Sequence, residues 1–239
     1  MDGGVGVADM GGGETRAIVI EGLQVGAPRR APADARGEAW ETGSFKAAVA
    51  GPLHLGRTNL AGDGQADLVN HGGADKAVCC YPAGHYPDWH RELGLDPAAF
   101  PHGAFGENLT LSGLTEATVS IGDTFRVGTA TVQVSQPRQP CWKLSRRWGV
   151  RDLAARVQRT SRTGWYVRVI EEGEIAAGQA LTLVDRPLPE WTVAQVTAVI
   201  YDDKDIAGAA ELATCDVLAD SLRAYMAERV EDANARMEI

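Results

Sequence analysis

The feature that most constrains the fold is a change of sequence period near residue 187. Before it, short runs of β-forming residues are separated by glycine and proline, and after Pro187 and Pro189 the apolar residues recur with helical spacing. Several short strands at this spacing are typical of a barrel or a sandwich. We therefore predict a mainly β domain over 15–186 and a small helical domain over 190–232. The expected strands are 17–25, 77–81, 108–111, 124–127, 131–135, 165–170 and 180–184.

Two runs in the β region predict a hairpin. Residues 124–127 and 131–135 alternate apolar and polar side chains on either side of a Gly-Thr pair, as paired strands with one buried face do. Two helices are expected to interrupt the strands, over 84–93 and 151–158. Residues 1–14 are rich in glycine and poor in apolar side chains, which predicts a flexible tail.

The helical region begins with a sequence pattern typical of a helix N-terminus. Thr192 followed three residues later by Gln195 makes a capping box. Apolar stripes then predict one helix over 206–213 and another over 217–226, with Asp216 as the cap of the second. The sequence therefore predicts a compact three-helix unit, in which Cys215 is a core residue.

Charge is distributed unevenly along the chain. The formal net charge is −9, which disfavours electrostatic binding of a nucleic-acid polymer. Residues 138–168 nevertheless carry nine Lys or Arg side chains against one acid, whereas residues 201–239 carry ten acids and four bases. A cationic region on an acidic protein suits a small anionic ligand. A solvated basic face would give the same composition.

The lengths of the apolar stretches and the spacing of the cysteines indicate the cellular compartment. None approaches the ~20 residues that a membrane-spanning helix needs, and no secretory signal is visible at the N-terminus. The four cysteines lack the spacing of a disulfide framework. We expect a cytoplasmic protein that has no membrane partner.

Cys141 is the strongest single candidate for chemistry. It follows a predicted strand in the segment 135–143, Ser-Gln-Pro-Arg-Gln-Pro-Cys-Trp-Lys, where Arg138 and Lys143 bring positive charge close to it. Nearby positive charge favours the thiolate, which is the form that attacks electrophiles or binds a soft metal. A buried structural cysteine is the alternative that this segment leaves open.

Three further clusters carry groups that suit an anionic or heterocyclic ligand. The segment 70–76 contains a Gly-Gly turn that an anion can approach closely, and 105–108 places a carboxylate and an amide at a strand start. The segment 159–166 offers two guanidinium groups and several hydroxyls, an arrangement suited to phosphate. Ordinary turns would explain either of the first two clusters alone. The residues singled out include His71, Gly72, Gly73, Lys76, Glu107, Asn108, Arg162 and Thr163.

Several common sites are disfavoured. A zinc site at Cys79, Cys80, His85 and His90 does not fit, because adjacent cysteines lack the usual spacing and the two histidines do not share a helix face. The sequence contains no phosphate-binding P-loop, no nucleophile elbow and no zinc-protease motif. The commonest nucleotide-binding, hydrolase and zinc-protease classes are therefore excluded.

As an ordered set, the clusters resemble the MOSC domain family (molybdenum cofactor sulfurase C-terminal domain), in its YiiM-like branch. The resemblance covers about residues 16–185, and the helical remainder is similar to the three-helix domain of that branch. It implies a closed MOSC-type β-barrel followed by a three-helix bundle. The matching motifs are His71-Gly72-Gly73 with Lys76, Tyr81-Pro82 with His85-Tyr86, and the segments 105–109, 135–141 and 162–166.

The resemblance also implies a function. It implies a molybdenum-pterin cofactor with Cys141 as the protein thiolate on molybdenum, and reduction of N-hydroxylated compounds such as hydroxylaminopurines. The expected partners are a small N-hydroxylated substrate and a separate electron-donating reductase, because the chain shows no motif for another redox cofactor. The expected catalytic residues are Cys141, His71 and Glu107. The expected cofactor-binding residues are His71, Gly72, Gly73, Lys76, Glu107, Asn108, Arg138, Lys143, Arg162, Thr163 and Trp165.

Two other functions would use the same thiol. One is a sulfur carrier that holds a persulfide on Cys141 for the synthesis of a metal-sulfur centre, and the other is a non-catalytic module that binds the cofactor. The helical domain also has two interpretations. It is either a packing or homodimerisation unit or an acidic surface that docks a basic redox partner.

Overall fold

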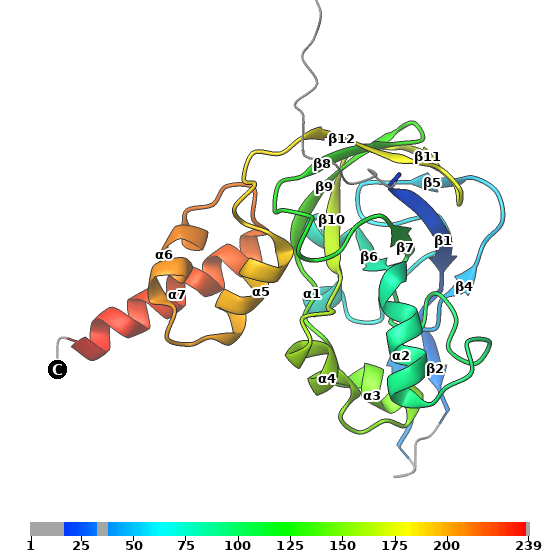
Figure 1. Cartoon of the computed structure of the whole chain (residues 1–239), viewed down its shortest axis with the longest axis horizontal. Coiled ribbons are helices and arrows are strands. Elements are labelled where there is room, and N and C mark those ends of the chain that lie inside the picture. The colour runs from blue at the N-terminus through cyan, green and yellow to red at the C-terminus, as the bar shows by residue number, and fades with distance from the viewer. Residues whose placement is uncertain (1–16, 33–37, 238–239) are drawn as a thin grey trace, which may run out of the picture.

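The computed structural model describes residues 17–32 and 38–237, so the expected tail over 1–14 lies outside the described residues. The strands form one large curled sheet and two small sheets, β2 with β3 and β5 with β11, and helices gather at one end and one side of the large sheet (Figure 1). The strands are β1 (Val19–Val25), β2 (Arg29–Ala31), β3 (Trp40–Thr42), β4 (Ala47–Ala48), β5 (Leu53–Leu55), β6 (Val78–Pro82), β7 (Leu109–Ser112), β8 (Thr124–Val127), β9 (Ala130–Pro137), β10 (Trp165–Glu171), β11 (Gly173–Ile175) and β12 (Leu181–Asp185). The α-helices are α1 (Leu68–His71), α2 (Tyr86–Leu93), α3 (Trp142–Trp148), α4 (Leu153–Arg159), α5 (Val193–Tyr201), α6 (Ile206–Ala213) and α7 (Asp220–Met237), and the 3-10 helices are η1 (Ala74–Lys76) and η2 (Ala83–His85).

The main sheet has eight strands in the order β12-β8-β9-β10-β6-β7-β1-β4. It curls until the start of β1 meets the chain ahead of β12, where Val19 and Ala180 form one bridge. The outer strands β12 and β4 do not pair with each other, so the expected closed barrel is wrong and the sheet is a half-barrel. A bulge between Ile20 and Gly22 interrupts the pairing of β1 with β7, and a bulge bends its strand.

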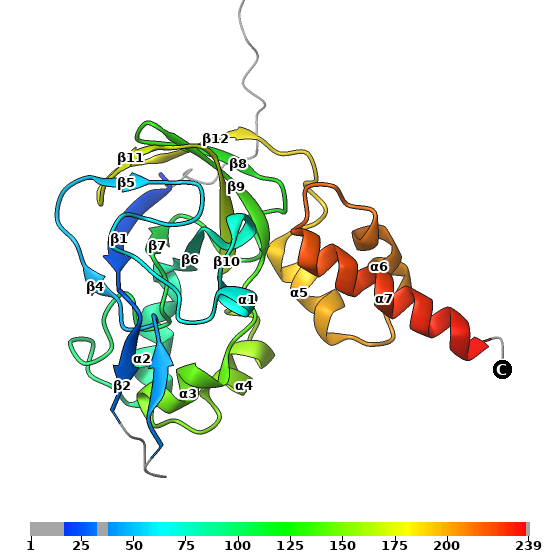
Figure 2. The same cartoon turned by 180° about the vertical axis from the view of Figure 1, so that it is seen from behind.

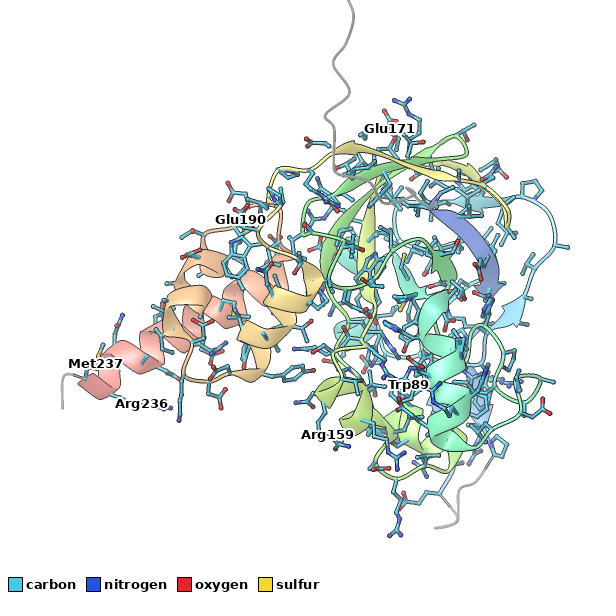
Figure 3. All side chains as sticks on the ribbon, in the orientation of Figure 1. Trp89, Arg159, Glu171, Glu190, Arg236 and Met237 are labelled. Carbon is cyan, nitrogen blue, oxygen red and sulfur yellow. The ribbon has the colours of Figure 1, made fainter. Side chains whose placement is uncertain are left out.

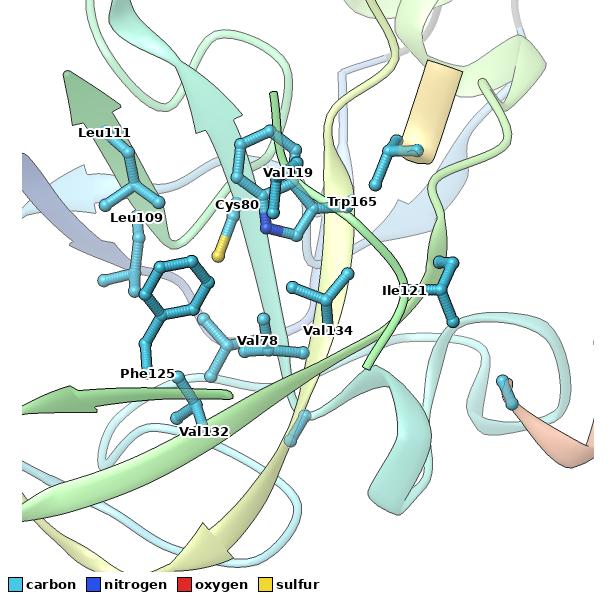
Figure 4. Packing of buried hydrophobic residues seen from close by; sticks show 14 of the residues in the cluster. Val78, Cys80, Leu109, Leu111, Val119, Ile121, Phe125, Val132, Val134 and Trp165 are labelled. Carbon is cyan, nitrogen blue, oxygen red and sulfur yellow. The ribbon is translucent and has the colours of Figure 1, made fainter. Parts of the chain in front are cut away.

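The concave face of the sheet holds the main core, and Figure 4 shows part of this packing. Cys80 on β6 and Trp165 on β10 are opposed in register, and both side chains lie in this core. Successive side chains on a strand point to opposite faces. Cys79 and Tyr166, the next register pair, therefore face away from the core.

A second, aromatic cluster lies at the end of the sheet where α2, α3 and α4 gather (Figures 1 and 2). The rings of Tyr81 and Phe105 stack with their centroids 4.2 Å apart. Trp89, labelled on α2 in Figure 3, is fully buried and donates its indole N–H to the Tyr81 hydroxyl at 2.7 Å. This cluster fixes the loop before β7, which contributes to the functional site.

Helices α5, α6 and α7 lie at the side of the sheet, with α7 running outward to the C-terminus (Figure 2). The capping box of Thr192 and Gln195 is confirmed. The expected cap at Asp216 is wrong, because Ala219 first bonds to the Ser135 carbonyl oxygen on β9 and α7 begins only at Asp220. Cys215 lies between α6 and α7 and is partly buried against the core. Within the described part of the chain, no helix is long and apolar enough to cross a membrane.

Candidate functional site

A cavity lies on the face of the sheet opposite the main core. Its wall combines strand residues with loops from distant parts of the chain. Cys79 and Tyr166 contribute from β6 and β10. The remaining wall residues come from the segments 42–46, 64–76, 105–108 and 138–144.

Cys141 opens into this cavity. It stands between the end of β9 and the first residue of α3, and its side chain is partly exposed rather than enclosed by the core. The cavity wall around it also includes the cations Arg138 and Lys143 and the imidazole of His71. The free thiol of Cys141 therefore shares a cavity wall with two cations and an imidazole.

Arg138 gives the cavity a buried cation with spare bonding capacity. The residue is only 9% exposed, and its Nη2 donates to the carbonyl oxygen of Phe105 at 2.6 Å. The other terminal nitrogen, Nη1, is buried and has no hydrogen-bond partner. A buried donor without a partner is costly, and more so when it belongs to a charged group. An anion in the cavity would remove this cost.

His71 and Lys76 form another part of the wall, at the ends of α1 and η1. Burial lowers the pKa of His71, and the positive charges of Arg138, Lys143 and Lys76 lower it further. The imidazole of His71 is therefore neutral near pH 7. Burial also lowers the pKa of Lys76, whose Nζ donates to the carbonyl oxygen of Asn70 at 2.8 Å.

Lys46 is a wall residue that the sequence patterns did not identify. Its Nζ pairs with the carboxylate of Asp63, and both side chains are almost fully buried. The pair holds the loop before residue 64 in place, because Asp63 also accepts the N–H of Gly26 at 2.8 Å. The wall carries four cationic side chains, Lys46, Lys76, Arg138 and Lys143, against one carboxylate, Asp67.

Cys79 and Tyr166 were also missed, although strand alternation could have indicated them. Their neighbours Cys80 and Trp165 occupy the core, so these two side chains must face the other side of the sheet. Burial raises the pKa of Cys79 to about 11 and also raises that of Tyr166. Both groups stay protonated near pH 7, which leaves Cys141 as the accessible thiol of the cavity.

No cluster of three or more His, Cys, Asp or Glu side chains suited to a metal ion occurs among the residues that the structure describes. A metal ion in this cavity would therefore need ligands from a bound group in addition to a single thiolate. The unpartnered Arg138 Nη1, the surrounding lysines and the Cys141 thiol fit an anionic cofactor that carries its own metal ligands.

Comparison with known proteins places the chain in a family. The MOSC domain profile matches residues 67–182, and the profile of the YiiM-like, 3-alpha helix domain matches residues 191–233. An uncharacterized protein of Bacillus subtilis, YflK, is 45% identical over 203 residues, which are 84% of this chain and 90% of that protein. The chain belongs to the YiiM-like family of MOSC-domain proteins.

Other relatives support this membership. The protein YiiM of Escherichia coli is 44% identical over 65% of this chain and 69% of its own length. The crystal structure of YiiM from Geobacillus stearothermophilus is 34% identical, covers 89% of this chain and 99% of that one, and has a TM-score of 0.74. A protein of Gibberella moniliformis named Reductase is 39% identical over 63% of this chain, which is 27% of its length.

This MOSC domain gathers only some of the predicted site residues. His71, Lys76, Asn108, Arg138, Cys141 and Lys143 line the cavity, whereas Gly72 and Gly73 belong to the adjoining turn and are not wall residues. Gly73 has φ +97°, which only glycine adopts easily, so the turn that presents Lys76 requires it. Asn108 lies on the wall, but its Oδ1 and Nδ2 bond to the backbone of Cys79 and Gln24.

Glu107 is fully buried beneath the wall of the MOSC domain. Its carboxylate accepts hydrogen bonds from the Tyr86 hydroxyl, the Thr110 hydroxyl and the backbone N–H groups of Gly103 and Phe105. These four donors occupy both of its oxygens. In this structure Glu107 therefore holds the 103–107 loop and does not reach the cavity.

The segment 162–165 also lies away from the cavity. Arg162 stacks over the Trp89 ring and pairs with Glu92 at 2.8 Å, on the outer side of α2. Thr163 is buried, and its hydroxyl donates to the Gly164 carbonyl oxygen. Trp165 occupies the main core because it alternates with Tyr166. Only Tyr166, at the end of this motif, reaches the cavity of the MOSC domain.

Proposed function

We propose that this MOSC protein holds a molybdenum-pterin cofactor in the cavity, with Cys141 as the thiolate on molybdenum, and reduces N-hydroxylated compounds with electrons from a separate reductase. The observation that carries the proposal is the opening of Cys141 into a cavity where the buried Arg138 Nη1 lacks a partner. Membership of the MOSC domain family and a relative named Reductase support the same assignment.

The cations of the wall would hold the anionic end of the cofactor. Arg138 can donate from Nη1 while Nη2 remains bonded to Phe105, and Lys143 and Lys76 add charge without a fixed direction. Arg162 lies outside the cavity and is not part of this set. When bound, the cofactor supplies two-electron transfer at its metal.

Reduction of an N-hydroxylated group consumes two electrons and two protons, breaks the N–O bond and releases water and an amine. Electrons would come from the reductase, and protons from side chains of the wall. Lys76 carries protons on Nζ, and its lowered pKa makes their release easier than from an exposed lysine. His71 is neutral near pH 7 and can accept a proton at one ring nitrogen and donate at the other.

Metal analysis tests the ligand assignment. The full chain, produced in a molybdate-replete host, should contain close to stoichiometric molybdenum, and Cys141→Ala should lose it because the thiolate is the protein's ligand. Cys215→Ala is the matched control, since Cys215 is also partly buried and free but lies outside the cavity. Equal metal in wild type and Cys141→Ala would overturn the assignment.

The same samples separate the alternatives. A mass increase of one sulfur atom on Cys141, in protein without molybdenum, would instead indicate a sulfur carrier. Turnover is measured as amine formed from a hydroxylaminopurine with a chemically reduced dye as donor. Molybdenum-loaded protein without turnover on N-hydroxylated substrates would indicate a non-catalytic cofactor-binding module.

A further inference from the structure

One carboxylate joins three parts of the chain beside the cavity. Oδ1 of Asp75, in η1, accepts a hydrogen bond from Nε of Arg168 on β10 at 2.8 Å. Oδ2 accepts the backbone N–H of Asp220, the first residue of α7, at 3.1 Å. The helical domain is thereby bonded to the turn that precedes Lys76.

Further hydrogen bonds surround this contact. The Ser135 hydroxyl donates to the Asp75 carbonyl oxygen at 2.5 Å, and the Ser135 carbonyl oxygen accepts the N–H of Ala219 at 2.9 Å. Arg168 also donates from Nη1 to the Val217 carbonyl oxygen at 3.0 Å. The Arg168–Asp75 pair is only 18% and 29% exposed, so it is better shielded than an ordinary surface pair.

The anchored turn continues directly into the cavity wall. Lys76 follows Asp75 in η1 and lines the cavity. Its Nζ donates to the Asn70 carbonyl oxygen, next to His71 on α1. A shift of η1 would therefore move the Lys76 charge, and with it the support of His71.

We infer that Asp75 is a positioning residue through which the C-terminal helical domain holds Lys76 in the cavity wall. The helical domain is then a structural part of the anion-binding site rather than a separate module. The inference rests on the proposed function only in taking the cavity to bind an anion. It assigns Asp75 no contact with substrate or cofactor.

The rate at which the Cys141 thiol is alkylated by a charged reagent depends on the charges around it. In full-length protein from a host that cannot make the pterin cofactor, the thiol is alkylated either by iodoacetate, an anion, or by iodoacetamide, which is neutral. The ratio of the two rates cancels changes in accessibility and retains the electrostatic contribution. Mass spectrometry of the Cys141 peptide separates it from the other three free cysteines.

Two substitutions at Asp220 isolate the bond to Asp75. Asp220→Pro removes the N–H that Asp75 accepts, and proline is well tolerated in the first turn of a helix. Asp220→Ala, the matched control, keeps that N–H and removes only the exposed carboxylate that pairs with Arg223.

We expect the iodoacetate-to-iodoacetamide ratio in Asp220→Pro to lie about threefold below that in Asp220→Ala, which has the same formal charge. This fall is smaller than the roughly fivefold effect of losing one unit charge at ~4 Å in water. Asp220→Ala should keep the wild-type ratio. Equal ratios in Asp220→Pro and Asp220→Ala, with native circular dichroism spectra, would overturn the inference. Absence of molybdenum from the wild type would contradict the proposed function but would not change the alkylation ratios.

Discussion

Arg138 and Phe105 are joined by a 2.6 Å hydrogen bond from the guanidinium Nη2 to the Phe105 carbonyl oxygen. The backbone N–H of Arg138 donates to the Gly164 carbonyl oxygen at 3.0 Å, which fixes the chain as it leaves β9. These two bonds set the direction of the guanidinium. Nη1 is left as a buried donor without a partner, in a cavity that also contains the Cys141 thiol.

Arg138→Lys should weaken retention of the anionic cofactor by about tenfold or more. Lysine keeps the charge but cannot bond to Phe105 and to an anion with one planar group, and a hydrogen bond to a charged group contributes roughly 1.5–3 kcal/mol. Molybdenum retained per chain after dialysis measures the effect. Arg159→Lys, at an exposed position labelled in Figure 3, is the control and should retain as much as the wild type. Equal retention in the two variants would contradict the role of Arg138.

Local sequence patterns correctly predicted those structural elements that are determined by residues close together in the sequence. The hairpin of β8 and β9 and the capping box of α5 are where the alternation and the Thr-Gln spacing predicted them. The segment before α3 also carried enough local signal to single out Arg138 and Cys141, which share the cavity. Asp216 failed as a cap because contacts with β9 delay the start of α7, and those contacts are not visible in the local sequence.

The rest of the cavity depends on long-range pairing. Cys79 and Tyr166 become wall residues only once the register of β6 and β10 is known. Lys46 lies on an irregular segment, and the position of this segment depends on the buried ion pair between Lys46 and Asp63. Glu107 lies in one of the motifs, yet four hydrogen-bond donors hold its carboxylate beneath the cavity wall. The motif thus singled out Glu107 without indicating that its side chain is turned away from the cavity.

Glu107→Gln should destabilise the fold by about 2–4 kcal/mol. The Glu107 carboxylate accepts four hydrogen bonds. In glutamine, the amide NH2 replaces one of the two carboxylate oxygens and points at hydrogen-bond donors. Those buried donors then lose their acceptor. Urea unfolding measures the loss. Tyr86→Phe is the control, because it removes one donor and leaves the carboxylate, at a cost of about 1 kcal/mol. Unchanged stability with lost turnover would instead assign Glu107 to catalysis.

The lowered pKa of His71 predicts a pH dependence of stability. The unfolded chain binds a proton at His71 more readily than the folded chain, so acidification favours unfolding. The free energy of unfolding of the wild type should fall relative to His71→Gln as the pH drops below about 6.5, and the difference should stop growing below the folded pKa. Urea unfolding of both proteins between about pH 8 and about pH 5 measures this difference. Parallel curves would show that His71 titrates normally.

Gly164 should tolerate alanine far less than Gly149 does, although both have positive φ angles, +70° and +67°. A Cβ at Gly164 would meet the backbone carbonyl oxygen of Cys80, whereas one at Gly149 would have no atom within 4 Å. Gly149→Ala should therefore cost only the left-handed backbone penalty of about 1 kcal/mol, and Gly164→Ala about 3 kcal/mol or more.

The Gly164→Ala substitution should also affect the cavity. The Gly164 carbonyl oxygen accepts the N–H of Arg138, so displacement of β10 from β6 also moves the guanidinium. In Gly164→Ala, molybdenum retention should fall together with the unfolding free energy, while Gly149→Ala should lose a little stability and no metal. Full retention in a destabilised Gly164→Ala protein would show that Arg138 holds its place without the Gly164 contact.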